Sequence, residues 1–100
     1  MTVQKKNRNE AVVFMGQKLT ATNSSELKEQ IYSLIAEGYR RITLDFSLSN
    51  FIDASGLGKI CALQKMLREN QGELRIINVN SSYVQRIFNL VQLQKVISIK

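Results

Sequence analysis

The stretch from Ile42 to Gly58 places the strongest constraint on the fold, because it passes from a strand pattern directly into the start of a helix. In Ile42–Phe46 apolar residues alternate with polar ones, as in a strand that buries one face. Asp53 then occupies the position of a helix N-cap, where a carboxylate can accept a hydrogen bond from the first turn and suits the positive end of the helix dipole. The stretch therefore predicts a buried strand followed by a capped helix.

Two glycines near the start of that helix, Gly56 and Gly58, are unfavourable for the helix itself. Each costs about 1 kcal/mol relative to alanine inside a helix. Their presence predicts that another backbone segment or a partner surface approaches the helix closely at this point.

The first half of the chain predicts a hairpin and a helix. Thr2–Lys6 has the pattern of an edge strand, and Ala11–Met15 that of a buried strand ended by Gly16. The capping sequence Asn23–Glu26 begins a helix whose apolar residues recur at helical spacing. We expect Gly38 to end this helix as a left-handed C-cap residue.

The second half predicts a central helix ended by Gly72, then a strand, a short helix and a final strand. The expected inward stripe of the central helix is Leu57, Ile60, Leu63 and Leu67, and its outward side chains are Lys59, Lys65, Arg68 and Glu69. The later elements are expected at Leu74, Ile76 and Val79 (strand), Val84, Ile87 and Phe88 (helix), and Val96–Ile99 (strand).

This alternation of strands and helices predicts an α/β fold, a mostly parallel mixed sheet of about five strands with helices packed on it. The chain has 100 residues, 44% of them hydrophobic, which is enough for one modest core. We therefore expect a single domain over residues 1–100. No apolar run approaches the roughly 20 residues that span a bilayer, and the start lacks a signal-peptide pattern, so we expect a cytoplasmic protein.

The sequence contains no His and a single cysteine, Cys61. Without His, both Ser-His-Asp and Cys-His catalysis and the commonest zinc ligand are missing. Ser55 does not lie in a Gly-x-Ser-x-Gly motif, and no phosphate-binding glycine loop occurs. We therefore expect no enzymatic activity, metal or cofactor, and we expect Cys61 to be a small buried side chain.

The formal net charge is +6. Lys and Arg are spread along the chain, and no aromatic residues alternate with them as in a stacking platform for nucleic acid. The charge therefore favours either an acidic protein partner or a solvated basic surface over nucleic-acid binding.

The motif LDFSLSNFIDASGLGKICAL resembles the STAS family (sulfate transporter and anti-sigma factor antagonist domains), in which a strand runs into Asp-Ser-Ser/Thr-Gly-Leu-Gly and then into a helix. Gly16, GELRIINVN and VQRIFNLVQLQKVISI also resemble family elements in the same order. The resemblance covers nearly the whole chain and implies the same α/β architecture.

In family members that are switched by phosphorylation, the resemblance implies a phosphoacceptor serine directly after the motif aspartate. Ala54 occupies that position and has no hydroxyl. Ser55, the next residue, is the one candidate for a substitute acceptor, because a phosphate there would lie at the positive end of a helix. A shift of one residue turns the side chain by about 100° around the helix, so the alternative is a hydroxyl that satisfies the helix start.

The resemblance further implies a protein-interaction module that binds an anti-sigma factor of the serine-protein-kinase type and frees a sigma factor. The implied contact positions are Asp53, Ala54, Ser55, Gly56, Leu57 and Gly58, together with Thr20 and Ala21 in the facing loop. Family members often carry an acidic residue near Thr20, and its absence leaves the identity of the partner open. With Ala54, the domain is expected to remain competent for binding unless Ser55 is phosphorylated.

Two alternatives remain open within the family. One is a subunit of a lipid or anion transport assembly, supporting a transport ATPase or channel, which association with anionic vesicles or a membrane ATPase would reveal. The other is a scaffold of a signalling complex of several STAS proteins, which self-association would reveal.

Overall fold

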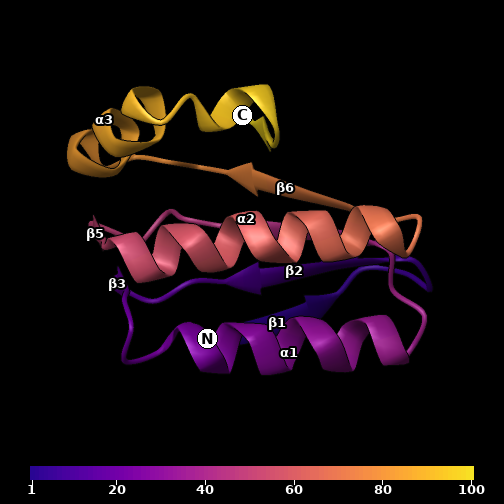
Figure 1. Ribbon diagram of the computed structural model, residues 1–100. Helices are drawn as coiled ribbons and strands as arrows, with labels where there is room; N and C mark the ends of the chain where they lie inside the picture. The colour runs from indigo at the N-terminus through magenta and orange to yellow at the C-terminus, as the bar shows by residue number, and fades with distance from the viewer.

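Five strands form one mixed sheet in the order β1-β2-β4-β6-β7 (Figure 1). A computed structural model describes all 100 residues and gives the strands as β1 Thr2–Lys5, β2 Glu10–Phe14, β4 Arg41–Asp45, β6 Glu73–Ile77 and β7 Ser98–Ile99. β1 runs antiparallel to β2, and the other neighbours are parallel. The mostly parallel sheet of five strands is thereby confirmed.

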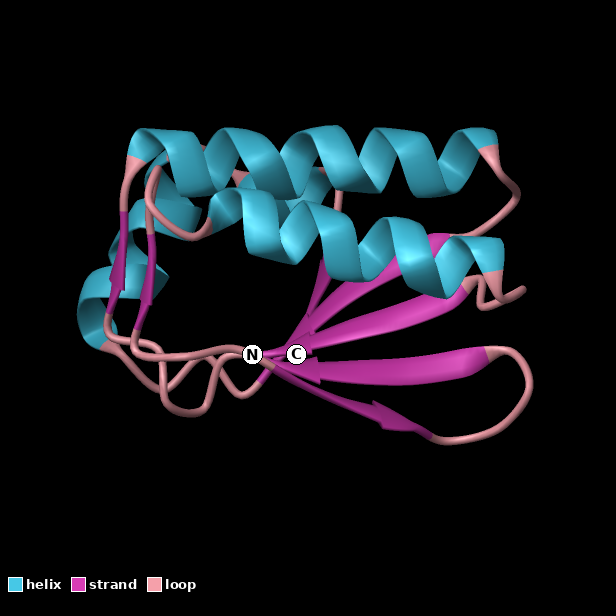
Figure 2. Cartoon of the chain, turned by 90° about the horizontal axis from the view of Figure 1, so that it is seen from below, coloured by secondary structure: helices cyan, strands magenta, loops and turns pink.

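Three α-helices accompany the sheet: α1 Ser24–Ala36, α2 Ala54–Glu69 and α3 Ser82–Leu90, with a short 3-10 helix, η1, at Leu93–Lys95. α1 and α2 lie side by side on one face of the sheet, and no helix covers the opposite face (Figure 2). The apolar side chains of β4 point toward these helices, which is the cause of the alternation at Ile42–Phe46, although Thr43 and Asp45 between them are also buried.

The core fills the layer between the sheet and these helices. Ile42 and Leu44 of β4, in the middle of the sheet, have no exposed surface. Phe46, just after β4, packs its ring edge to face against Phe88 of α3 at 5.6 Å, which joins the third helix to the same core. The core members are Ala11, Val13, Met15, Leu19, Leu27, Ile31, Leu34, Ile42, Leu44, Phe46, Ile52, Ile60, Leu63, Leu67, Leu74, Ile76, Val84, Phe88, Leu93 and Ile97.

A second, two-stranded sheet pairs β3 (Lys18–Leu19) with β5 (Phe51–Ile52) in parallel. No sequence pattern predicts this sheet, since two residues are too few for a periodic pattern. The pairing continues on both sides, where the amide of Asn50 donates to the carbonyl of Gln17 at 2.8 Å. It brings the loop after β3 to the start of α2.

Three details differ from expectation in the second half of the chain. β6 ends at Ile77, so Val79 lies after the strand. The final strand is confirmed but covers only Ser98–Ile99, because the amides of Val96 and Ile97 both donate to the carbonyl of Leu93 and continue the turn of η1. Cys61 is exposed rather than buried. It follows Ile60, whose side chain points into the core, and the next residue of a helix is turned about 100° away from that direction.

The helix ends also differ in part from expectation. Gly38 follows α1 with a φ of +102°, as predicted. α2 ends at Glu69, and the left-handed residue after it is Gln71, with a φ of 63°, rather than Gly72. Gly72 has another reason to lack a side chain, because a Cβ there would lie 2.5 Å from the carbonyl oxygen of Arg40.

The N-terminus of α1 lacks the predicted side-chain cap. Asn23 is the N-cap residue but makes no capping hydrogen bond. Its Oδ1 accepts from the amide of Thr20 at 2.9 Å, and its Nδ2 donates to the carbonyl of Lys18 at 2.7 Å. Asn23 therefore fixes the loop before the helix, and the helix end itself stays uncapped.

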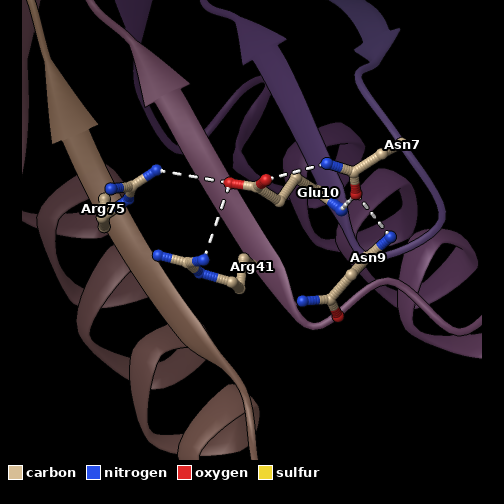
Figure 3. A network of polar contacts seen from close by, with 5 residues as sticks. All are labelled: Asn7, Asn9, Glu10, Arg41 and Arg75. Carbon is tan, nitrogen blue, oxygen red and sulfur yellow. Dashed lines mark hydrogen bonds and ion pairs between the residues drawn. The ribbon is translucent and has the colours of Figure 1, made fainter.

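A polar network joins the three central strands where they begin (Figure 3). Glu10 Oε2 of β2 lies 3.9 Å from Arg41 Nη1 of β4 and 3.8 Å from Arg75 Nη2 of β6. Asn7 Nδ2 donates to Glu10 Oε1 at 2.8 Å. This hydrogen bond, with the charges of Arg41 and Arg75, holds the pKa of Glu10 below its usual range against the opposing effect of desolvation.

Asp45 ends β4 as a buried carboxylate. Its Oδ1 accepts from the amide of Ser47 at 2.8 Å, and its Oδ2 accepts from Asn78 Nδ2 at 3.1 Å. Burial is the largest single influence and raises the pKa of Asp45, but the hydrogen bonds from Ser47 and Asn78 together outweigh it and lower the pKa below its ordinary value.

A carboxylate with a lowered pKa stabilises the fold above its unfolded pKa of about 3.9 and loses this contribution as the pH falls through the folded value. We expect Asp45→Asn to flatten the decline in the free energy of unfolding below about pH 4, because the variant has no such proton to take up. Urea unfolding at several acidic pH values measures the slopes. Glu69→Gln, at an exposed carboxylate of α2, should keep the wild-type slope, and equal slopes for wild type and Asp45→Asn would contradict the expectation.

Candidate functional site

The predicted N-cap of α2 is confirmed. Asp53 has an extended backbone with φ −107° and ψ 179°, and its Oδ1 accepts a hydrogen bond from the amide of Gly56 at 2.8 Å. α2 begins at Ala54, directly after the cap. The carboxylate therefore satisfies one of the amides that a helix start leaves without a partner.

The second oxygen of Asp53 reaches across to the loop after β3. Its Oδ2 accepts from the amide of Ala21 at 3.1 Å, while the amide of Asp53 donates to the carbonyl of Leu19 at 3.2 Å. One residue thus joins two segments 32 positions apart in the chain. The loop after β3, which contains Thr20 and Ala21, consequently lies beside the first turn of α2. Figure 1 shows β3 and the start of α2 at the end of the sheet where β4 and β6 finish.

The two glycines of α2 have different structural reasons. A Cβ on Gly56 would lie 2.4 Å from the carbonyl oxygen of Leu19, so the backbone of β3 approaches the helix too closely for any side chain. A Cβ on Gly58 would meet nothing within 4 Å. The close approach of another backbone segment is confirmed for Gly56, whereas Gly58 faces open space.

The surface around the helix start consists of short side chains. Ala54, Ser55 and Gly58 are exposed, Leu57 is half-buried and Gly56 is buried. The hydroxyl of Ser55 makes no hydrogen bond within the chain and so does not satisfy the helix start. A partner can therefore approach the backbone of α2 here without meeting a long side chain.

An exposed aromatic pair next to this surface was missed from the sequence. Phe51 of β5 stacks on Tyr83 of α3 with ring centroids 5.4 Å apart and planes 6° from parallel. Both remain well exposed, at 37% and 41%, and nearby in the chain Leu48 is 70% exposed. The pair joins elements far apart in sequence, so no local pattern could reveal it.

Metal-binding clusters and membrane-spanning helices are two other features on which the structure is informative. No group of three or more His, Cys, Asp or Glu side chains is arranged to hold a metal ion. No helix combines the length and apolar character needed to cross a membrane.

The glycines provide a matched test of this geometry. We expect Gly56→Ala to lower the free energy of unfolding by about 1–3 kcal/mol, since the new methyl group overlaps the Leu19 carbonyl. Gly58→Ala should raise it by up to about 1 kcal/mol through helix propensity alone. Urea denaturation of both variants measures the changes, and a loss of similar size at the two positions would contradict the geometry.

Comparison with known proteins places the chain in a family. The STAS domain family matches residues 1–100. The protein BtrV of Bordetella bronchiseptica, assigned as an anti-sigma factor antagonist, is 26% identical over 72 residues. The match covers 72% of this chain and 61% of BtrV, so the chain spans about three fifths of that relative.

Solved structures share the fold over nearly the whole chain. An assigned anti-sigma factor antagonist of Thermotoga maritima is 25% identical, with a TM-score of 0.82 over 95% of this chain and 81% of its own. The antagonist SpoIIAA in its unphosphorylated form is 19% identical, with a TM-score of 0.77 over 99% and 86%. Its phosphorylated form, from Bacillus, gives a TM-score of 0.76 at 19% identity over 99% and 89%. The chain is therefore a member of the STAS domain family.

Proposed function

We propose that this protein binds an anti-sigma factor of the serine-protein-kinase type and thereby frees a sigma factor. The contact is the helix-start surface, which we define as Thr20, Ala21, Asp53, Ala54, Ser55, Gly56, Leu57 and Gly58. The observation that carries the proposal is the pair of hydrogen bonds that the Asp53 carboxylate accepts from Ala21 and Gly56, which holds the loop of Ala21 against the exposed first turn of α2. Relatives described as anti-sigma factor antagonists support the class of partner.

The shape of the helix-start surface also supports a protein partner. Its short side chains bury little of the α2 backbone, and Gly58 keeps an open position although alanine would favour the helix. A residue that costs stability at an exposed position is best explained by contact with another molecule. The exposed Phe51 and Tyr83 pair adds apolar area beside it.

We propose further that the protein is always competent to bind its partner. Ala54 has no hydroxyl at the position where switched relatives are expected to carry phosphate. A phosphate at this helix start would add about two negative charges and their hydration to a closed interface, which opposes binding. Without an acceptor at residue 54, binding would be set by the amounts of the protein and its partners.

Replacement of Ala54 by Asp tests the interface. We expect wild type to retain a kinase-type anti-sigma factor from a native lysate, and Ala54→Asp to bind it about tenfold or more weakly, because the interface must then bury a carboxylate. Mass spectrometry identifies the retained protein, and titration calorimetry with the purified partner gives the affinities. Ala36→Asp makes the same change at the exposed far end of α1 and should bind as wild type. Equal retention by all three proteins would contradict the proposed interface.

Phosphorylation is tested with the purified partner and ATP. We expect no phosphate on wild type and one phosphate on Ala54→Ser, with Ser55→Ala identical to wild type. Intact mass and site mapping distinguish the positions. Stoichiometric phosphate on Ser55 that abolishes binding would overturn the proposal that the protein is always competent to bind, while leaving the binding surface in place.

A further inference from the structure

An exposed apolar surface continues from the helix-start surface toward α3. Phe51 lies two residues before Asp53, and its ring stacks on Tyr83 of α3. Leu90 follows Tyr83 by two helical turns, so it lies on the same side of α3, and it is 72% exposed. Leu48 occupies the exposed turn before β5. We call these four side chains the α3 patch: Leu48, Phe51, Tyr83 and Leu90.

The two rings of the α3 patch are attached to well-held backbone. Tyr83 lies in the first turn of α3, where Ser81 Oγ accepts from the amide of Val84 at 3.2 Å. The amide of Phe51 donates to the carbonyl of Gln17 at 3.3 Å. A ring whose position is already fixed loses little conformational entropy when a partner covers it. The pair is therefore suited to anchor another molecule.

The helix-start surface lacks anchors of this kind. Most of the energy of a protein interface comes from a few large residues, chiefly Trp, Tyr and Arg, and none of these occurs in the helix-start surface. Tyr83 and Arg86, three residues apart on α3, are neighbours on the helix surface and both are exposed. The α3 patch can therefore supply the large side chains that the helix-start surface does not have.

Two cations without ion-pair partners flank the α3 patch. Lys18 is the register partner of Phe51 in the pairing of β3 with β5. Both side chains are exposed, while the next residue of each strand is buried, so they point to the same outer face. Arg86 extends from the exposed side of α3. Neither Lys18 nor Arg86 forms an ion pair within the chain.

Carboxylates are scarce around the α3 patch. No Asp or Glu occurs in the segments that carry the patch and its cations, residues 15–25, 46–52 and 78–100. Asp45 and Asp53 border these segments, but their oxygens accept hydrogen bonds from inside the chain. Glu26 begins α1, which Figure 1 shows on the other side of α2 from α3. The free charges beside the patch are both positive, which suits an acidic ligand.

We propose that the α3 patch binds an acidic segment of the protein partner, which places an apolar side chain on the Phe51 and Tyr83 rings and its carboxylates at Lys18 and Arg86. The inference rests on the proposed function for the identity of that partner, and it adds a second contact beside the helix-start surface. A second copy of this chain would bring like charges together. An anionic membrane is typically bound by clusters of about four to eight cations, rather than by two. Charge and size therefore favour the acidic protein segment.

The first test needs no partner. Amide chemical shifts are recorded during titration with the end-capped peptide Asp-Glu-Trp-Asp-Glu, and then with its neutral counterpart Asn-Gln-Trp-Asn-Gln. We expect saturable shifts at Phe51 and Tyr83, with a millimolar dissociation constant for the acidic peptide and about tenfold weaker binding of the neutral one. Arg86→Gln should weaken the acidic peptide about threefold, and Arg68→Gln, in the last turn of α2, should not. Absence of saturable shifts, or equal binding of the two peptides, would overturn the acidic docking surface.

The second test uses the purified partner. We expect Tyr83→Ser to weaken the complex about tenfold, because the anchoring ring is lost. The double variant Lys18→Gln and Arg86→Gln should reduce the dependence of the affinity on salt. Tyr32→Ser removes a similarly exposed ring from α1 and should bind as wild type. Titration calorimetry at two salt concentrations gives the affinities, and urea unfolding checks that each variant is folded.

The outcomes separate this inference from the proposed function. Full binding by Tyr83→Ser and Arg86→Gln together with loss in Ala54→Asp would overturn the docking surface and leave the proposed function intact. Binding of the acidic peptide, with no anti-sigma factor retained by wild type, would support the α3 patch and contradict the proposed function. Flotation with anionic vesicles, or dimers in light scattering, that Tyr83→Ser abolishes would assign the patch to a membrane or a second copy and overturn the acidic segment.

Discussion

The carboxylate of Asp53 makes the interactions on which the structure of the helix-start surface depends. One oxygen caps α2 and the other holds the amide of Ala21, so a single side chain both starts a helix and positions a loop. The close approach of β3 to Gly56 leaves no room for a side chain between these segments. The arrangement of the helix-start surface is therefore set by backbone groups, which few substitutions on the surface can alter.

The two ends of the sheet differ in structure. Where the central strands begin, Glu10 joins β2 to β4 and β6 through Arg41 and Arg75, and this end holds the strands together (Figure 3). Where they finish, chain segments turn into loops and helix starts with free amides. The starts of α1 and α2 lie at this second end, and a helix start leaves backbone amides without partners inside the helix.

Much of the fold follows from the sequence, because its main elements are long enough to show a period. The alternation at Ile42–Phe46, the cap at Asp53 and the need for a close approach at Gly56 are each properties of a few adjacent residues. The pairing of β3 with β5 and the stacking of Phe51 on Tyr83 are not, since each joins short segments that are distant in the chain. The sequence therefore predicts the local features at the start of α2, but it does not predict which distant segments pack around them.

The wrong prediction at Cys61 has a different origin. Cys61 lies one turn after Leu57, but Leu57 is itself only half-buried, and the buried face is set by Ile60, Leu63 and Leu67. Gln64 also belongs to the buried face, where its side chain accepts from the amide of Leu74 and donates to the carbonyl of Val96. A buried polar residue thus joins α2 to two other segments by hydrogen bonds, and a pattern of apolar residues does not predict such a position.

The small sheet of β3 and β5 has a consequence for the motions of the protein. Only two residues on each side pair there, whereas the central strands pair over five. Elements with few backbone hydrogen bonds open at lower free energy than the core, and their amides exchange with solvent sooner. The segment that holds the loop of Thr20 and Ala21 is thus a local unit of lower stability than the central sheet, and a partner bound at the proposed surface would slow hydrogen exchange there.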